Sequence, residues 1–134
     1  MKRLISFFTV CLILCGIHAT AQVKTSLDGR SFSITLTQSG AKKTQTSWHW
    51  GNDELQFMSG KMLTSSIKSH ERFNEAKYVA TAGSTAVKFT CIARNSNGAT
   101  LKWSGTIQGN KISGTVTWKN ASGSQTYSYT GTAK

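Results

Sequence analysis

The carboxy-terminal half of the chain alternates apolar and polar residues almost without interruption, and glycine-containing turns divide it into short segments. Over residues 87–134, apolar side chains alternate with Ser, Thr and Lys, and turn signals stand at Asn97-Gly98, Gly109-Asn110 and Ser122-Gly123. A period of two residues buries one face of a strand and exposes the other, and such turns join consecutive strands into hairpins. This pattern constrains the chain to an antiparallel, all-β fold.

The same alternation, although weaker, extends through the first half of the chain. We predict strands over residues 31–38, 46–50, 54–58, 61–65, 76–81, 86–94, 100–107, 112–119 and 125–132. Gly51-Asn52-Asp53 is predicted to be a turn, and residues 67–75, which lack alternation, a loop or at most one helical turn. Short strands at even spacing, without a long crossover, are typical of a single up-and-down β-barrel of about eight strands.

The first 21 residues have the layout of a cleavable export signal. Met1-Lys2-Arg3 is basic, residues 4–17 are mostly apolar, and Ala19-Thr20-Ala21 offers the small residues that a signal peptidase accepts. We therefore expect cleavage before Gln22 and a mature protein in the periplasm or outside the cell. The apolar stretch is too short to span a bilayer, so we expect no membrane span. A lipid anchor on Cys15 is the alternative.

Loss of residues 1–21 would leave 113 of the 134 residues, which suits one β-barrel domain over residues 22–134. The formal net charge would fall from +11 to +9 because Lys2 and Arg3 leave with the signal. Cys91 would remain as the only cysteine, so we expect no internal disulfide. Because Cys91 alternates in step with Phe89, we predict a buried, unreactive thiol.

Aromatic residues and glycines share the apolar faces of the last three predicted strands. These faces carry Leu101, Trp103, Gly105 and Ile107, then Ile112, Gly114, Val116 and Trp118, and finally Tyr127, Tyr129 and Gly131. Glycines so close to large rings indicate strong strand coiling and space for a neighbouring ring. An eight-stranded barrel encloses just enough interior for side chains or for one small ligand. The rings therefore either fill the barrel or line a cavity.

Three segments give the chain a resemblance to known proteins. They are LDGRSF at residues 27–32, LQFMSGK at residues 55–61 and WSGTIQGNKISGTVTW at residues 103–118. In these segments the chain resembles a family of small exported bacterial proteins described as lipocalin-like or calycin-like barrels, over most of residues 27–134. The resemblance implies the barrel fold. It implies no activity and no site residues, because its motifs are turn glycines and core aromatics.

Residues that could carry catalysis are few. The acids are Asp28, Asp53, Glu54, Glu71 and Glu75, and the histidines after the signal are His49 and His70. Asp53 and Glu54 are adjacent, so on a strand they point to opposite faces and make a poor acid/base pair. The chain has no serine-hydrolase elbow and no glycine-rich phosphate loop. We predict a protein that is not an enzyme and that has no cofactor and no metal site.

The positive charge is spread along the chain. The scattered lysines are Lys42, Lys43, Lys77, Lys88, Lys102, Lys111 and Lys119. Outward lysines can simply prevent sheet edges from aggregating, or they can attract an anionic partner. We expect no nucleic-acid partner, because nucleic-acid barrels place aromatic residues among the lysines and here the two types lie on opposite faces.

Two functions follow from these observations. The first is a binding module for a small apolar or amphipathic ligand, lined by Trp48, Trp50, Trp103, Trp118, Tyr127 and Tyr129. The alternative is an interaction protein with a filled core. Its basic outer surface would bind an anionic component of the cell envelope or inhibit a secreted enzyme. In either case we expect a monomer.

Overall fold

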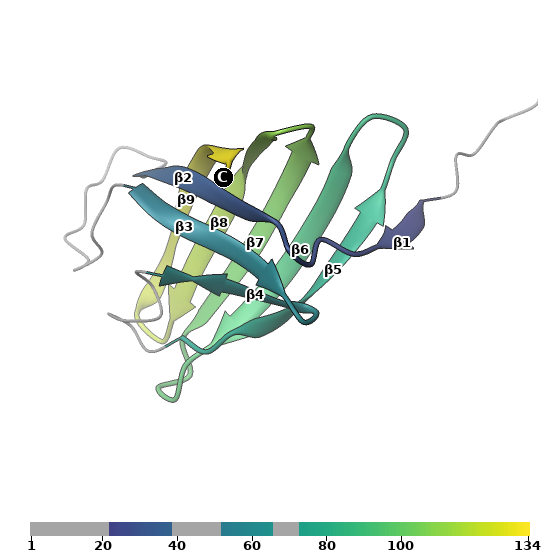
Figure 1. Ribbon diagram of the computed structural model, residues 1–134. Helices are drawn as coiled ribbons and strands as arrows, with labels where there is room; N and C mark the ends of the chain where they lie inside the picture. The colour runs from purple at the N-terminus through teal and green to yellow at the C-terminus, as the bar shows by residue number, and fades with distance from the viewer. Residues whose placement is uncertain (1–21, 39–51, 66–72) are drawn as a thin grey trace, which may run out of the picture.

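The fold is all β, as the alternation predicts. The structure is a computed structural model that describes residues 22–38, 52–65 and 73–134. Its strands are β1 (Val23–Thr25), β2 (Ser31–Gln38), β3 (Asn52–Met58), β4 (Lys61–Thr64), β5 (Ala76–Ala82), β6 (Val87–Arg94), β7 (Thr100–Gln108), β8 (Lys111–Asn120) and β9 (Gly123–Ala133). Figure 1 shows these strands wrapping around one interior.

Strands β2 to β9 close into an eight-stranded antiparallel barrel. Each strand pairs with the next one along the chain, and β9 returns to pair with β2. This is the predicted up-and-down topology. The ninth strand, β1, lies outside the closed ring and pairs with residues 80–82 of β5, where β4 no longer covers the edge. Its addition protects an edge that could otherwise pair with another chain.

The predicted strands agree with the observed ones within two residues in most places, and β2 agrees fully. The predicted turn at residues 51–53 is wrong in part, because Asn52 and Asp53 are the first residues of β3. They pair with Thr35 and Ile34 of β2, and this pairing overrides their local turn preference. The short strand β1 was not predicted. The predicted strand over residues 46–50 lies outside the described residues.

The inward faces of the strands form one hydrophobic core. Its largest fully buried side chains include Trp103, Tyr127, Tyr129, Phe57 and Phe89. The ring of Phe57 packs edge-on against Phe89 with a centroid separation of 5.1 Å, and Trp103 lies 5.4 Å from Tyr129. The aromatic residues predicted to face inward therefore pack against each other.

Two glycines make this packing possible. Gly105 and Gly114 are directly opposite each other on β7 and β8, under the ring of Tyr129. A Cβ on Gly105 would meet the Tyr129 hydroxyl and lie 2.5 Å from the Phe89 ring. A Cβ on Gly114 would collide with the Ser104 carbonyl oxygen. Only glycine lets the rings approach the strands this closely.

One end of the barrel, which we call the latched end, is closed by hydrogen bonds from the segment before β2. The Asp28 carboxylate accepts hydrogen bonds from the Gly60 N–H at 2.9 and 3.0 Å and from the Tyr78 hydroxyl at 2.8 Å. The Tyr78 hydroxyl in turn accepts a 2.8 Å bond from the Leu27 N–H. Leu27 is buried below this network. The motifs LDGRSF and LQFMSGK therefore meet at the latched end.

The latched end also contains tight turns. Ser59 and Gly60 join β3 to β4, and both have positive φ, 52° and 73°. Two consecutive positive values match the hairpin turns whose twist fits the flanking strands. Arg30 donates a 2.7 Å hydrogen bond to the Gly109 carbonyl in the β7–β8 turn. These contacts fix three separate turns to one another.

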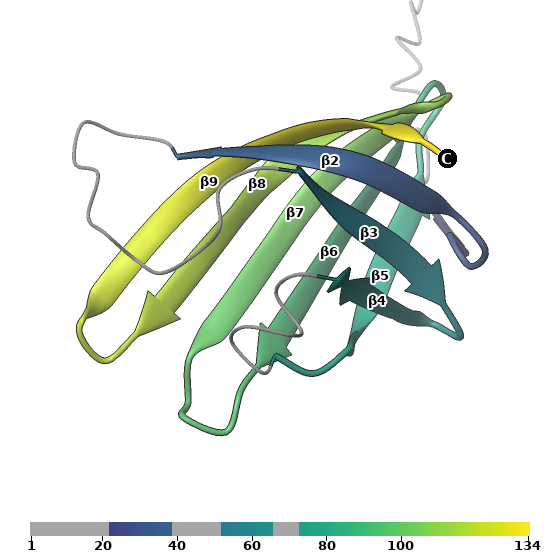
Figure 2. The same ribbon diagram turned by 60° about the vertical axis from the view of Figure 1, so that its left-hand side comes forward.

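The opposite end, which we call the loop end, carries the other set of connections. Here β2 ends and β3 begins, β4 ends and β5 begins, and the β6–β7 and β8–β9 hairpins turn. Figure 2 shows these two hairpins at one end of the barrel and the C terminus with the β7–β8 turn at the other. Among the described residues that we expected to line a cavity, Trp103, Trp118 and Tyr127 lie in the halves of their strands nearer the loop end.

Candidate functional site

The aromatic residues proposed as ligand-lining all face the interior where the structure describes them. Trp103, Tyr127 and Tyr129 are each 1% exposed, and Trp118 is half-buried against the same core. The structure therefore brings these four together on β7, β8 and β9. Trp48 and Trp50 lie outside the described residues.

Tyr129 shows how completely the middle of the barrel is packed. Its hydroxyl donates a 3.0 Å hydrogen bond to the Ser104 carbonyl oxygen. Burial raises the pKa of Tyr129 well above its ordinary value, so the ring stays neutral. Because the hydroxyl of Tyr129 already has a backbone partner, this side chain has a structural role in the core.

A small internal cavity lies toward the loop end. It is bordered by Met62, Phe73, Ala93, Leu101 and Trp103, and its volume is about 20 Å³. That space corresponds to about one water molecule, whereas sites for small ligands usually enclose about 300–1,000 Å³. Phe73, which is 3% exposed, forms part of the wall of this cavity.

Cys91 is buried, as predicted, and has no disulfide partner among the described residues. Its Sγ lies 3.5 Å from the Ala76 carbonyl oxygen, to which it donates a weak hydrogen bond. Burial raises the pKa of the thiol from 9.0 to about 11. The protonated thiol is a poor nucleophile at neutral pH.

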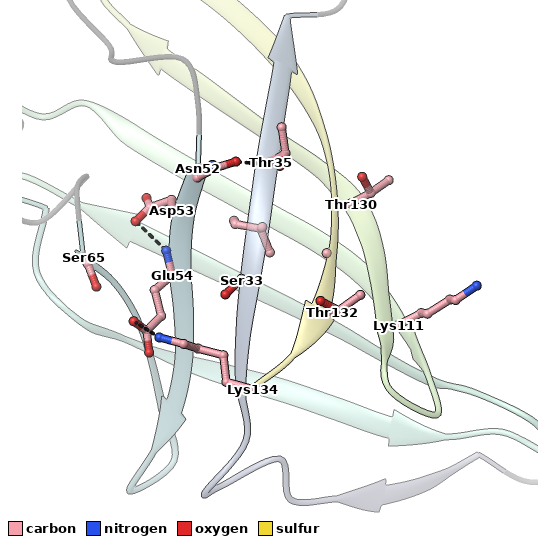
Figure 3. A pocket seen from close by; sticks show the side chains of 12 residues that line it. Ser33, Thr35, Asn52, Asp53, Glu54, Ser65, Lys111, Thr130, Thr132 and Lys134 are labelled. Atoms are coloured by element: carbon pink, nitrogen blue, oxygen red, sulfur yellow. Dashed lines mark hydrogen bonds and ion pairs between the residues drawn. The ribbon is translucent and has the colours of Figure 1, made fainter.

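A hollow lies on the outside of the barrel, over β9, β2 and β3 (Figure 3). We call it the outer groove, and its volume is about 750 Å³. Short hydroxyl side chains form its floor, and longer side chains stand at its rim. It is lined by Ser33, Ile34, Thr35, Asn52, Asp53, Glu54, Ser65, Lys111, Thr130, Gly131, Thr132 and Lys134.

The outer groove is polar and has internal charge pairing. Lys134 Nζ lies 2.9 Å from Glu54 Oε2, and Gln56 donates a 2.8 Å bond to Glu54 Oε1. The hydrogen bond from Gln56, and then the one from Lys134, lower the pKa of Glu54. Asp53 points to the other face of β3, is 8% exposed, and accepts a 2.7 Å bond from the Glu54 N–H. The two acids therefore do not form an acid/base pair.

In residues 22–38, 52–65 and 73–134, most cations lack an acidic partner. Lysine and arginine outnumber aspartate and glutamate by 16 to 5 in the sequence. The described acids are engaged elsewhere: Asp28 at the latched end, Asp53 toward the interior, Glu54 with Lys134, and Glu75 with Lys61 at 2.9 Å.

Four of the described cations that form no ion pair lie over β5, β6 and β7, which are on the far side of the barrel from β2 and β9. Other described cations that are exposed and form no ion pair are Lys24 on β1 and Lys111 and Lys119 on β8. We call this surface the basic–apolar face. It consists of Lys77, Val79, Lys88, Ile92, Arg94 and Lys102, all of which are exposed. Within the described part of the chain, none of these four cations forms an ion pair. Lys88 and Lys102 lie on the face opposite the buried aromatic residues, as predicted for the lysines.

Sequence reasoning missed the two apolar members of this face. Val79 is 56% exposed and Ile92 is 48% exposed. A signal was present for Ile92, because Cys91-Ile92-Ala93 interrupts the alternation and one of the three side chains has to point outward. Phe73 was also missed, since it lies in a stretch without any pattern.

Other kinds of site find no support in the described residues. No group of three His, Cys, Asp or Glu side chains within them could hold a metal ion, and His49, His70 and Glu71 lie outside them. Among the same residues there is no helix with the length and hydropathy needed to cross a membrane.

No protein-family model, no curated protein and no solved structure matches this chain. The resemblance to exported lipocalin-like proteins therefore depends on the three sequence segments alone. The eight-stranded antiparallel barrel, in contrast, is a finding of the structure.

Proposed function

We propose that this protein is an exported interaction module that acts by binding and not by catalysis, and that its outer surface binds an anionic component of the cell envelope. The observation that carries this proposal is the cluster of cations on the basic–apolar face, none of which pairs with a described acid. Like charges held together on one surface destabilise the protein unless a partner of opposite charge compensates for them.

The packed interior supports the same proposal. The side chains that could line a ligand cavity are in contact with one another, and the Tyr129 hydroxyl already has a backbone acceptor. The described acids are likewise committed to turns and ion pairs. Among the described residues, the polar and charged groups without a partner in the protein are therefore found mainly on the outer surface.

A heparin column tests the proposal. We expect the purified protein to be retained and to elute with salt, because exposed charges are screened beyond about 10 Å at 0.1 M ionic strength. Any protein of this net charge would show some retention, so position has to be tested. Lys77→Gln with Lys102→Gln changes the basic–apolar face, and Lys111→Gln with Lys134→Gln removes the same charge from the outer groove.

If the binding site is localised, Lys77→Gln with Lys102→Gln lowers the salt concentration at which the protein elutes clearly more than Lys111→Gln with Lys134→Gln does. Equal effects would mean that only net charge matters and would contradict the proposal. Circular dichroism confirms that both variants are folded.

The small cavity beside Phe73 and Trp103 favours one other candidate, a site for a small apolar ligand at the loop end. This candidate predicts that a fluorescent fatty-acid analogue changes the tryptophan emission with micromolar affinity. It also predicts that Phe73→Ala, which enlarges the cavity, strengthens the binding. An absence of response in both proteins would rule the candidate out.

The exported location and the membership of the lipocalin-like family are part of the proposal. Both are supported by sequence features: the basic, apolar and small-residue layout of residues 1–21, and the three segments that carry the resemblance. Mass spectrometry of the protein from the periplasm or the medium should give a chain that begins at Gln22. A mass that corresponds to acylated Cys15 would overturn the expected cleavage site.

A further inference from the structure

Ile92 is an exposed apolar side chain in a basic setting. Arg94 follows it two residues later on the same face of β6, and Lys102 of β7 is its direct cross-strand partner. Lys77 of β5 precedes Tyr78, whose partner on β6 is Cys91, the residue before Ile92. Neighbouring strands are about 4.8 Å apart, so Lys77, Arg94 and Lys102 all lie near Ile92 on the outer surface.

Val79 extends the apolar part of this face. It lies two residues from Lys77 on β5, pairs with Thr90, and is 56% exposed. Strands β5 and β6 lie side by side in Figure 1, so Val79 and Ile92 are diagonal neighbours on one surface. Two attractions act at a lipid–water interface: burial of apolar side chains and electrostatic attraction to anionic headgroups. Exposed Val and Ile side chains flanked by lysines combine both.

A hollow continues from this face toward β1. It is lined by Val23, residues 82–86 and Lys88, and its volume is about 560 Å³. Val23 is 64% exposed. Lys24 and Lys88 flank Thr81 in adjacent strands, and Lys88 also lines this hollow.

We propose that the basic–apolar face docks onto the surface of an anionic lipid bilayer, with Val79 and Ile92 entering the headgroup region and the surrounding cations contacting lipid phosphates. This inference rests on the proposed function and specifies its partner. A soluble polyanion would use the cations alone, whereas a bilayer also uses the apolar side chains. Val79 and Ile92 therefore distinguish the two.

The experiment is sedimentation of the purified protein with phosphatidylcholine vesicles that contain about one third phosphatidylglycerol. We expect binding to these vesicles, little binding to pure phosphatidylcholine, and release at high salt. Lys77→Gln with Lys102→Gln should lower the partition coefficient by about 30-fold. Lys111→Gln with Lys134→Gln, on the outer groove, should change it by no more than about threefold, as expected for more distant charges.

The contribution of the apolar side chains to vesicle binding is tested with one variant and a matched control. Ile92→Ser should weaken vesicle binding by about tenfold, because it removes a buried aliphatic contact. Met58→Ser changes a side chain of similar exposure, 55%, at the latched end of β3. It should leave vesicle binding unchanged. Circular dichroism and the urea midpoint establish that both proteins are folded.

The outcomes separate this inference from the proposed function. Loss of vesicle binding in both Lys77→Gln/Lys102→Gln and Ile92→Ser supports the bilayer. If Ile92→Ser binds vesicles as the wild type does, or if no vesicle binding occurs while retention on heparin persists, the lipid inference is wrong and the proposed function stands. If neither vesicles nor heparin are bound, both are wrong.

Discussion

Inward and outward side chains alternate along the same strands of this barrel, but the two sets have different roles. Inside, the Tyr129 hydroxyl donates a hydrogen bond to the Ser104 carbonyl oxygen, and the Trp103 ring packs on Tyr129. Outside, the cations of the basic–apolar face have no acidic partner among the described residues, and Val79 and Ile92 are exposed to solvent.

This difference indicates where function can be located. Inward side chains are fixed by packing, so their identity reports on the fold. Charged and apolar side chains that remain exposed are not needed for packing, and a contiguous group of them indicates an interaction surface.

The largest expected change in stability comes from removing an inward aromatic ring. Trp103→Ala should lower the free energy of unfolding by about 3–5 kcal/mol, because the side chain is 1% exposed and its loss leaves a cavity. Ile92→Ala, on the outside, should lower it by no more than about 1 kcal/mol. Urea denaturation measures both. Similar values for the two variants would mean that the interior is not tightly packed.

The next effect concerns the close approach of β7, β8 and Tyr129. Gly114→Ala should destabilise the protein by about 3 kcal/mol, at the upper end of the overpacking range, because the new Cβ meets backbone atoms that cannot move aside. Thr115→Ala changes the exposed neighbour on the same strand and should stay below about 1 kcal/mol. If Gly114→Ala is tolerated equally well, the strands are further apart than described.

A smaller effect should appear at alkaline pH. The pKa of Cys91 is raised from 9.0 to about 11 by burial, so the folded state holds its proton more tightly than the unfolded state. The resulting stabilisation is complete below pH 9 and is lost as the pH rises toward 11. The free energy of unfolding should therefore decline less steeply over this window in Cys91→Ala. Equal slopes would place the thiol in contact with solvent.

Much of the fold could be predicted from the sequence. Phe32, Ile34 and Leu36 alternate without a break, so β2 has the predicted bounds. Asn52 and Asp53 were misjudged because their turn preference is local, while their pairing with β2 depends on residues 17 or more positions away. β1 has only three residues and carries no recognisable pattern.

The candidate site was less predictable. Alternation correctly places Trp103, Tyr127 and Tyr129 inside. It does not determine whether rings line a cavity or fill it, because that depends on which residues face one another across the barrel, such as Phe89 and Gly105. The basic–apolar face is likewise assembled from three strands, and its members come together only once the register of those strands is fixed.

The most direct test of binding through the outer surface is a map of amide chemical-shift changes when anionic bicelles are added to the ¹⁵N-labelled protein. We expect changes at Lys77, Val79, Ile92 and Lys102, with little change at Trp103, Tyr127 and Tyr129 inside the barrel. Changes concentrated on the inward residues, or none on β5, β6 and β7, would contradict the claim that this barrel acts through its outer surface.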